Sequence, residues 1–101
     1  MRIGWIGGLD RSRALLERVA EEEGHVLEAH TGDVSGRGSH ELEGLVERSD
    51  IVVVITELNS HGAMYRAKDL AREKGRPFLA LRRGSVSGLR KVMGALRQRA
   101  A

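Results

Sequence analysis

The sequence lacks cysteine, has only three aromatic residues and contains no long hydrophobic run. Without cysteine, the chain can form no disulfide and no thiolate metal site, and it has no cysteine nucleophile. The longest unbroken apolar run, residues 51–55, is far shorter than the roughly 20 residues that cross a membrane. Residues 1–10 show no targeting pattern. We therefore expect a cytoplasmic protein that does not associate with membranes.

The chain has 101 residues, enough for one hydrophobic core, and we assign residues 1–101 to a single domain. The formal net charge is only +3, but the charges are unevenly distributed. Residues 1–57 hold twelve acidic and six basic side chains, whereas residues 58–101 hold two acidic and eleven basic ones. Opposite charge on two halves favours self-association. We expect a homodimer formed through the third or fourth helix of the chain.

Four apolar segments alternate with segments of helical periodicity, and this order is typical of βαβ units. We predict strands at residues 3–6, 26–29, 51–55 and 78–81. Parallel strands joined by crossover helices form right-handed units, which place helices on both faces of a sheet. We therefore predict a small Rossmann-like α/β fold of three layers, with four helices and a four-stranded parallel sheet of order 2-1-3-4. This order puts the two most apolar strands at the centre.

The first two helices are predicted from apolar residues at helical spacing and from residues typical of helix ends. The first spans about residues 11–23, is capped by Asp10 or Ser12, and ends at Gly24. The second follows a glycine-rich loop at 31–38, which we expect to be mobile, and Ser39 is its predicted cap.

The third and fourth helices have clear end signals as well. The third begins at Ser60 and ends before Gly75. The fourth is capped by Ser85 or Ser87. Alternation along the first strand predicts that Trp5 is half-covered, and Tyr65 is expected to be partly covered at the edge of the third helix.

In a doubly wound sheet the ligand binds beyond the carboxyl ends of the strands, where the strand order reverses. This rule selects the loops after the first and third strands. The first loop contains Gly7 and Gly8, which let the backbone approach a ligand closely, and Ser12 beside a helix start whose free amides attract anions. It has neither the dinucleotide fingerprint nor the Walker A pattern, so it predicts no particular nucleotide.

The other loops at this edge are also rich in groups that bind small polar or anionic ligands, such as hydroxyls and guanidinium groups. No nucleophile elbow accompanies them, so we expect binding rather than catalysis. The predicted ligand-binding residues are Gly7, Gly8, Ser12, Thr56, Asn59, Ser60, His61, Arg82, Ser85 and Ser87.

Glycine, histidine, hydroxyl and basic residues recur along the chain in a characteristic order. They are Gly7, Gly8, His30, Gly32, Asp50, Thr56, Ser60, His61, Ala63, Ala67, Lys68, Pro77, Arg82, Ser85, Ser87 and Leu89. With this spacing the chain resembles, over nearly its whole length, the bacterial family catalogued as domain of unknown function 2325. The resemblance implies a Rossmann-like domain without an established activity, and it favours Thr56, Ser60, His61 and the loop at 82–87 as a shared site.

Three functions remain open from the sequence. The leading hypothesis is a domain that binds or senses a small anionic or nucleotide-like ligand. The second is a protein that binds haem or a divalent metal through His61 or His30, with Met64 as a further ligand, because imidazole is the commonest metal ligand left to a chain without cysteine. The third is a nucleic-acid accessory domain, which is less favoured because the basic residues are not interleaved with aromatic ones.

Overall fold

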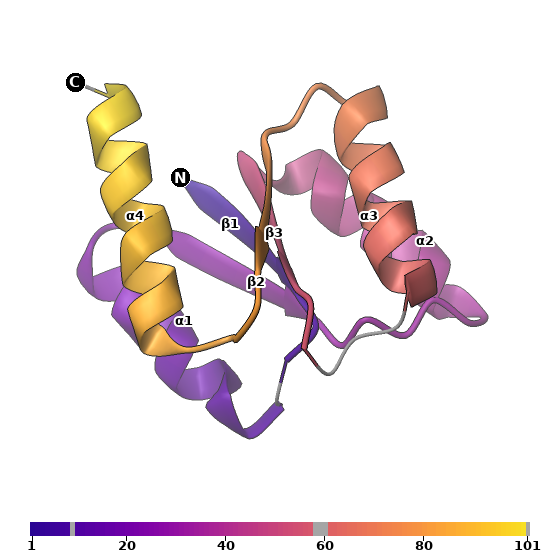
Figure 1. The fold of residues 1–101 in the computed structure, drawn as a ribbon, viewed down its shortest axis with the longest axis horizontal. Helices are drawn as coiled ribbons and strands as arrows, with labels where there is room; N and C mark the ends of the chain where they lie inside the picture. The colour runs from indigo at the N-terminus through magenta and orange to yellow at the C-terminus, as the bar shows by residue number, and fades with distance from the viewer. Residues whose placement is uncertain (9, 58–60, 101) are drawn as a thin grey trace.

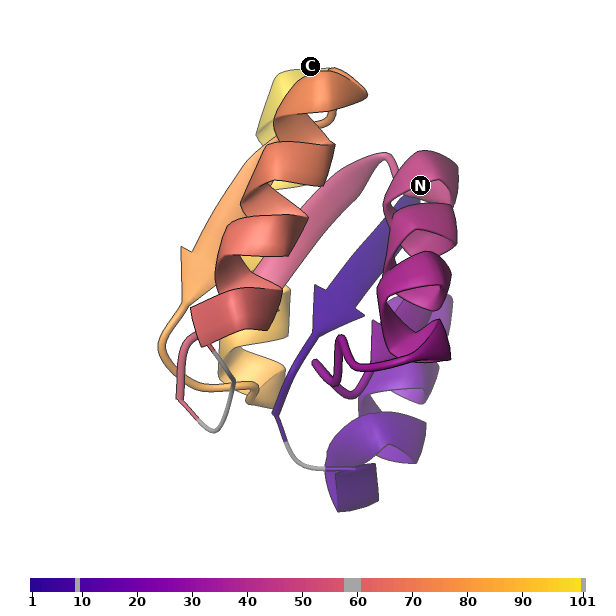
Figure 2. The same cartoon turned by 90° about the vertical axis from the view of Figure 1, so that its right-hand side faces the viewer.

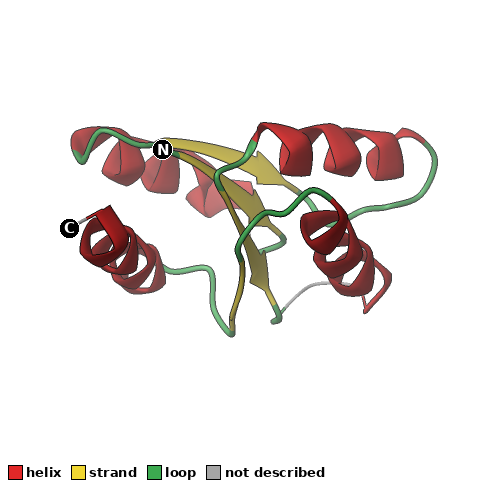
Figure 3. Ribbon diagram, turned by 90° about the horizontal axis from the view of Figure 1, so that it is seen from above, coloured by secondary structure: helices red, strands yellow, loops and turns green. Residues whose placement is uncertain are grey.

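The computed structural model describes residues 1–8, 10–57 and 61–100, which fold into a parallel sheet between two layers of helices (Figures 1 and 3). The elements follow one another as β1 (Arg2–Ile6), a 3-10 turn (Asp10–Ser12), α1 (Arg13–Glu22), β2 (Val26–His30), α2 (Arg37–Arg48), β3 (Ile51–Ile55), α3 (His61–Glu73), β4 (Phe78–Leu81) and α4 (Val86–Ala100). Helices α1 and α4 pack together on one face of the sheet, and α2 and α3 pack together on the other. The predicted three-layer α/β architecture is confirmed.

The sheet is parallel throughout and has the order β2-β1-β3-β4. Trp5 of β1 is in register with Ala29 on one side and with Val53 on the other. The predicted strand order is therefore confirmed. In Figure 2 the strands run in one direction, so that their carboxyl ends and the loops that follow lie at the same edge of the molecule.

The hydrophobic core consists of two clusters, one on each face of the sheet. β3 contributes to both, and all five of its residues are buried, as expected of a central strand in a parallel sheet. Trp5 belongs to the cluster under α1 and α4 and is only 2% exposed, so the prediction that it is half-covered is wrong. The reason is that β1 is also a central strand and is covered on both faces. Tyr65 is 68% exposed, contrary to the expected partial cover.

Two helix ends follow the sequence signals closely. Gly24 and Gly75 both have positive φ, at 81° and 67°, which an L side chain rarely adopts. The amide of His25 donates to the Ala20 carbonyl, and that of Arg76 donates to the Ala71 carbonyl. These bonds close the last turns of α1 and α3 as predicted. None of the described helices is long and apolar enough to cross a membrane.

The start of α2 differs from the prediction. The helix begins at Arg37, so Ser39 lies inside its first turn and is not the cap. Gly36 occupies the cap position with a φ of 53°. The helix can begin this early because its first turn packs closely on the preceding loop. This packing requires glycine at position 38, since a Cβ there would overlap the Asp33 carbonyl. Ser12 does stand at the cap position of α1, but its side chain makes no capping hydrogen bond.

Charge complementarity between the two halves of the sequence is satisfied within the chain. Several ion pairs join a basic residue of the second half to a glutamate of the first half. They are Arg66 with Glu43, Lys74 with Glu47, Arg83 with Glu57, and Arg90 and Arg97 with Glu23. The opposite charges of the two halves therefore meet within one molecule, and they are not by themselves an argument for a dimer.

Gly4 allows α2 to pack directly on β1. A Cβ at this position would lie 2.5 Å from Ser49 Oγ and 2.6 Å from Leu45 Cδ2. Ser49 is buried, and its hydroxyl donates to the Leu45 carbonyl, so neither group can move without breaking a buried contact.

We expect Gly4→Ala to lower the free energy of unfolding by about 1–3 kcal/mol, the usual cost of overpacking a core. Gly94→Ala is the matched control, because a Cβ there meets only the far end of Arg97 and alanine favours a helix. Urea denaturation of both variants measures the difference. Equal stability of Gly4→Ala and the parent would show that α2 does not approach β1 this closely.

Candidate functional site

The loops after β1, β3 and β4 enclose a cavity of about 310 Å³ at the carboxyl edge of the sheet. We call it the switch-point crevice, because β1 and β3 are the neighbouring strands at which the chain order reverses. Its lining residues are Gly8, Ser12, Ile55, Glu57, Arg83, Gly84 and Ser85. Gly8, Ser12 and Ser85 were among the predicted ligand-binding residues, and the structure brings these three together.

The amino end of α4 forms one wall of the switch-point crevice. Ser85 caps this helix, since its Oγ accepts a hydrogen bond of 3.1 Å from the amide of Gly88. Val86 and Ser87, the first residues of the helix, follow Ser85 but do not themselves line the crevice. The positive end of the helix dipole beside Ser85 favours an anion nearby.

The guanidinium group at the crevice belongs to Arg83, and Arg82 does not line it. Arg83 Nε lies 3.4 Å from a carboxylate oxygen of Glu57, and both side chains are largely exposed. Arg82 contributes its main chain, since its carbonyl accepts a hydrogen bond from the Glu57 amide. This bond ties the loop after β4 to the loop after β3. The sequence could not distinguish the two adjacent arginines, because the choice depends on the direction of this turn.

Trp5 lies directly beneath two glycines of the crevice. A Cβ on Gly84 would lie 3.5 Å from the indole nitrogen Nε1 of Trp5, and a Cβ on Gly8 would lie 3.9 Å from it. The indole of Trp5 lines the neighbouring cavity between α1 and β2. The two glycines therefore bring the edge of this indole close to the floor of the crevice, a contact that the sequence does not indicate.

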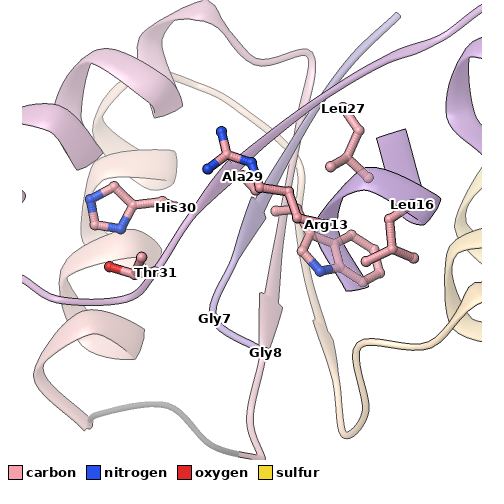
Figure 4. A pocket seen from close by; sticks show the side chains of 9 residues that line it. Gly7, Gly8, Arg13, Leu16, Leu27, Ala29, His30 and Thr31 are labelled. Carbon is pink, nitrogen blue, oxygen red and sulfur yellow. The ribbon is translucent and has the colours of Figure 1, made fainter. Parts of the chain in front are cut away.

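A second cavity of about 220 Å³ lies between α1 and β2 (Figure 4). Leu16 and Leu27 give it an apolar wall, and Arg13 lies beside them. The Arg13 guanidinium is engaged by Glu17 at 2.9 Å. Gly7 also lines this cavity, and its amide is bonded to the His30 carbonyl. This cavity offers less to an anion than the switch-point crevice.

His30 fastens the end of β2 to the start of α2. Its Nδ1 accepts a hydrogen bond of 3.0 Å from the amide of Gly32, and therefore Nε2 carries the proton and donates to the Gly38 carbonyl at 3.0 Å. Both ring nitrogens are thus engaged by the backbone. This geometry favours a structural role for His30 over metal ligation.

The other residues predicted to bind a metal are not assembled with His30. His61 is the exposed first residue of α3, and Met64 is partly buried against the core between α2 and α3. Neither lines the switch-point crevice or the cavity beside β2. In the part of the chain that the structure describes, no group of three or more histidine or acidic side chains could hold a metal ion.

The remaining predicted ligand residues are placed as follows. Thr56 and Ser87 are exposed at the carboxyl edge but do not line the switch-point crevice. Asn59 and Ser60 lie outside the described residues. The predicted residues that meet in the crevice are therefore those of the loops after β1 and β4, and their role in ligand binding stays a prediction.

The loop between β2 and α2 is organised by its own side chains, although we expected it to be mobile. The carboxylate of Asp33 accepts hydrogen bonds from both Oγ and the amide of Ser35. The bond from the Ser35 hydroxyl is the main reason that the pKa of Asp33 lies below its ordinary value. His30 holds the same loop from beneath.

A parallel sheet of this order, covered on both faces and hollowed at its switch point, defines a small Rossmann-like α/β domain. Residues 2–96 match the family model described as "uncharacterized protein conserved in bacteria (DUF2325)", and the chain belongs to this family. No curated protein and no solved structure matches the chain. The family resemblance stated from the sequence is thus confirmed.

The structural role of His30 can be tested by replacing its side chain with that of alanine. We expect His30→Ala to lower the free energy of unfolding by about 1–3 kcal/mol, because the partly buried Gly32 amide and Gly38 carbonyl lose their hydrogen bonds to the imidazole. Amide exchange at Gly32 should also become faster. His40→Ala, at an exposed position of α2, is the control and should leave both measurements unchanged. A stable His30→Ala variant with unchanged exchange at Gly32 would contradict this role.

Proposed function

We propose that the protein binds a small anionic, nucleotide-like ligand in the switch-point crevice. The observation that carries this proposal is that the loops after β1, β3 and β4 meet around one cavity of about 310 Å³, which is lined by Arg83, Ser12 and Ser85. Guanidinium and hydroxyl groups bind phosphate and carboxylate oxygens. The absence of side chains at Gly8 and Gly84 lets a ligand lie close to the main chain and to the edge of the Trp5 indole.

The walls of the crevice supply groups suited to the anionic part of such a ligand and to its hydroxyl groups. The Arg83 guanidinium and the positive end of the α4 dipole beside Ser85 suit a phosphate or carboxylate. The Glu57 carboxylate suits a hydroxyl, such as those of a sugar. Because the Glu57–Arg83 pair is exposed, it contributes little to stability and can open to receive both groups.

The alternative functions have less support. A haem or metal site would have to be built from His61 or Met64 alone, because the ring of His30 is occupied by backbone groups. A nucleic-acid surface would need free basic side chains, and several of those in the second half are engaged by glutamates. We expect the ligand to be a cytoplasmic metabolite, because a chain without cysteine forms no disulfide and does not depend on an oxidising compartment.

Binding can be followed without a label, because Trp5 is the single tryptophan of the chain. We expect titration with adenosine monophosphate or inorganic phosphate to change its fluorescence in a saturable way and to raise the melting temperature with ligand concentration. The affinity should fall as ionic strength rises. Gly84→Ala should weaken binding by about tenfold, because the added Cβ takes up space at the floor of the crevice, 3.3 Å from Ile55 Cγ1 and 3.5 Å from Trp5 Nε1. Gly94→Ala is its control.

A saturable signal that Gly84→Ala leaves unchanged would show that the ligand does not reach Trp5. The absence of any signal with phosphates, sugar phosphates and nucleoside monophosphates would contradict the proposal itself.

Three further variants locate the site. We expect Arg83→Ala to weaken binding of the phosphate probe with little effect on the melting temperature, because exposed charges contribute little to stability. Arg82→Ala and His61→Ala should bind it like the parent, since neither residue lines the crevice. Loss of binding in His61→Ala alone would instead place the site at the start of α3, as the sequence hypothesis had it.

A further inference from the structure

The cavity beside β2 is lined mainly by apolar groups. The indole of Trp5 and the side chains of Leu16 and Leu27 border it, and all three are buried in the same core cluster. Figure 4 shows the two leucines, one on α1 and one on β2. Side chains that border an empty space lose van der Waals contacts on that side. A flat apolar group placed there would restore them.

A small side chain on β2 leaves this space beside the indole. Ala29 is in register with Trp5 on the neighbouring strand and lines the same cavity. Residues in register on adjacent strands direct their side chains to the same face of the sheet. The methyl group of Ala29 therefore stands next to the indole and covers little of it. A larger side chain at this position would fill the cavity.

The cavity beside β2 and the switch-point crevice adjoin each other. Gly8 lines both, and as a glycine it places no side chain between them. The Trp5 indole is a second common boundary. It lines the cavity beside β2, and its Nε1 lies 3.5 Å from the position of a Cβ on Gly84, a residue of the crevice. A ligand that passes over Gly8 can therefore reach both cavities.

The volumes of the two cavities favour one ligand that occupies both. The cavity beside β2 measures about 220 Å³ and the crevice about 310 Å³. Sites for small organic ligands are roughly 300–1,000 Å³ in volume. The first cavity alone is below this range and the crevice is at its lower limit, whereas the two together lie well within it. Such a ligand has an anionic part for the crevice and an apolar part for the cavity beside β2.

The groups around the cavity beside β2 favour a heteroaromatic ring as the apolar part. Bases stack on aromatic side chains, and the Trp5 indole lines this cavity. Arg13 lines it as well, and its guanidinium is fixed by Glu17 at 2.9 Å. A guanidinium plane stacks on aromatic rings. Thr31 adds a hydroxyl, which both donates and accepts hydrogen bonds and so suits the polar edge of a base.

We propose that the ligand is a nucleoside monophosphate that lies across Gly8, with its base in the cavity beside β2 and its phosphate in the switch-point crevice. This inference rests on the proposed function and adds to it the ring and the place of the ring. It distinguishes nucleotides from sugar phosphates and inorganic phosphate, which the crevice alone would hold. The Trp5 indole then contacts the base.

Calorimetric titration of the full chain with three phosphates tests the proposal. The probes are adenosine monophosphate, ribose 5-phosphate and n-butyl phosphate. We expect adenosine monophosphate to bind about tenfold more tightly than either of the others, because only its base stacks on the indole. Equal affinity for adenosine monophosphate and ribose 5-phosphate overturns the inference. So does n-butyl phosphate binding as tightly as the nucleotide, since an aliphatic chain would then serve as well as a ring.

Ala29→Val tests the place of the ring, because two added methyl groups occupy the cavity beside β2. Valine favours a strand, so the fold should be kept. We expect the affinity for adenosine monophosphate to fall about tenfold, to that of ribose 5-phosphate, whose own affinity stays unchanged. Ala80→Val, at an exposed position of β4 that lines neither cavity, is the matched control and should bind both probes like the parent. A folded Ala29→Val variant that binds the nucleotide like the parent contradicts this placement.

Fluorescence of the parent protein supplies a test that needs no variant. We expect adenosine monophosphate at saturation to change the emission of Trp5 more strongly than ribose 5-phosphate does, because only the base contacts the indole. An equal change with both ligands overturns the inference. The two proposals fail in different ways. If ribose 5-phosphate binds and the base adds nothing, the crevice remains the anion site and only the placement of a ring is wrong, whereas failure of all the phosphates to bind removes both proposals.

Discussion

The burial of β3 on both faces is the constraint on which the rest of the molecule depends. Its five residues, Ile51–Ile55, are all buried, and side chains that point alternately to two faces leave water only if helices cover both. The chain meets this requirement by sending α1 and α4 to one face and α2 and α3 to the other. Because crossovers are right-handed, helices reach both faces only if the chain adds strands in both directions across the sheet, to one side of β1 and to the other side of β3. The loops that follow β1 and β3 therefore lead to opposite faces, and the crevice lies between them.

Much of the fold was predictable from local sequence. Apolar strands separated by helical spacing gave the sheet and its order, and Gly24 and Gly75 marked helix ends because a positive φ there requires glycine. The start of α2 was not predictable. It depends on contacts of Gly38 with Asp33 and His30, which are formed only in the folded chain. Trp5 was placed too near the surface because alternation along β1 cannot show that helices cover both faces.

The position of the crevice was predictable from the strand order, but the arrangement of the groups around it was not. The rule for doubly wound sheets led to Gly8, Ser12 and Ser85, which do meet in one cavity. It did not lead to Trp5, because the indole comes close to the crevice only when Gly8 and Gly84, far apart in the sequence, pack above it. Nor did it show that His30, promising as a ligand, uses both nitrogens on the backbone. The residue type shows which ligands a side chain is able to bind, but only the folded structure shows whether its polar atoms already have hydrogen-bond partners.

The ion pairs between the acidic first half and the basic second half have a consequence for how the chain folds. In the unfolded ensemble each half repels itself and attracts the other, so the segments of α3 and α4 are drawn toward those of α1 and α2 before the parallel strands pair. Closing long loops is the slow step of parallel-sheet topologies, and this attraction offsets part of its entropic cost. Salt screens such an attraction. We therefore expect this chain to fold more slowly as the ionic strength rises, even where the native contacts themselves are little weakened.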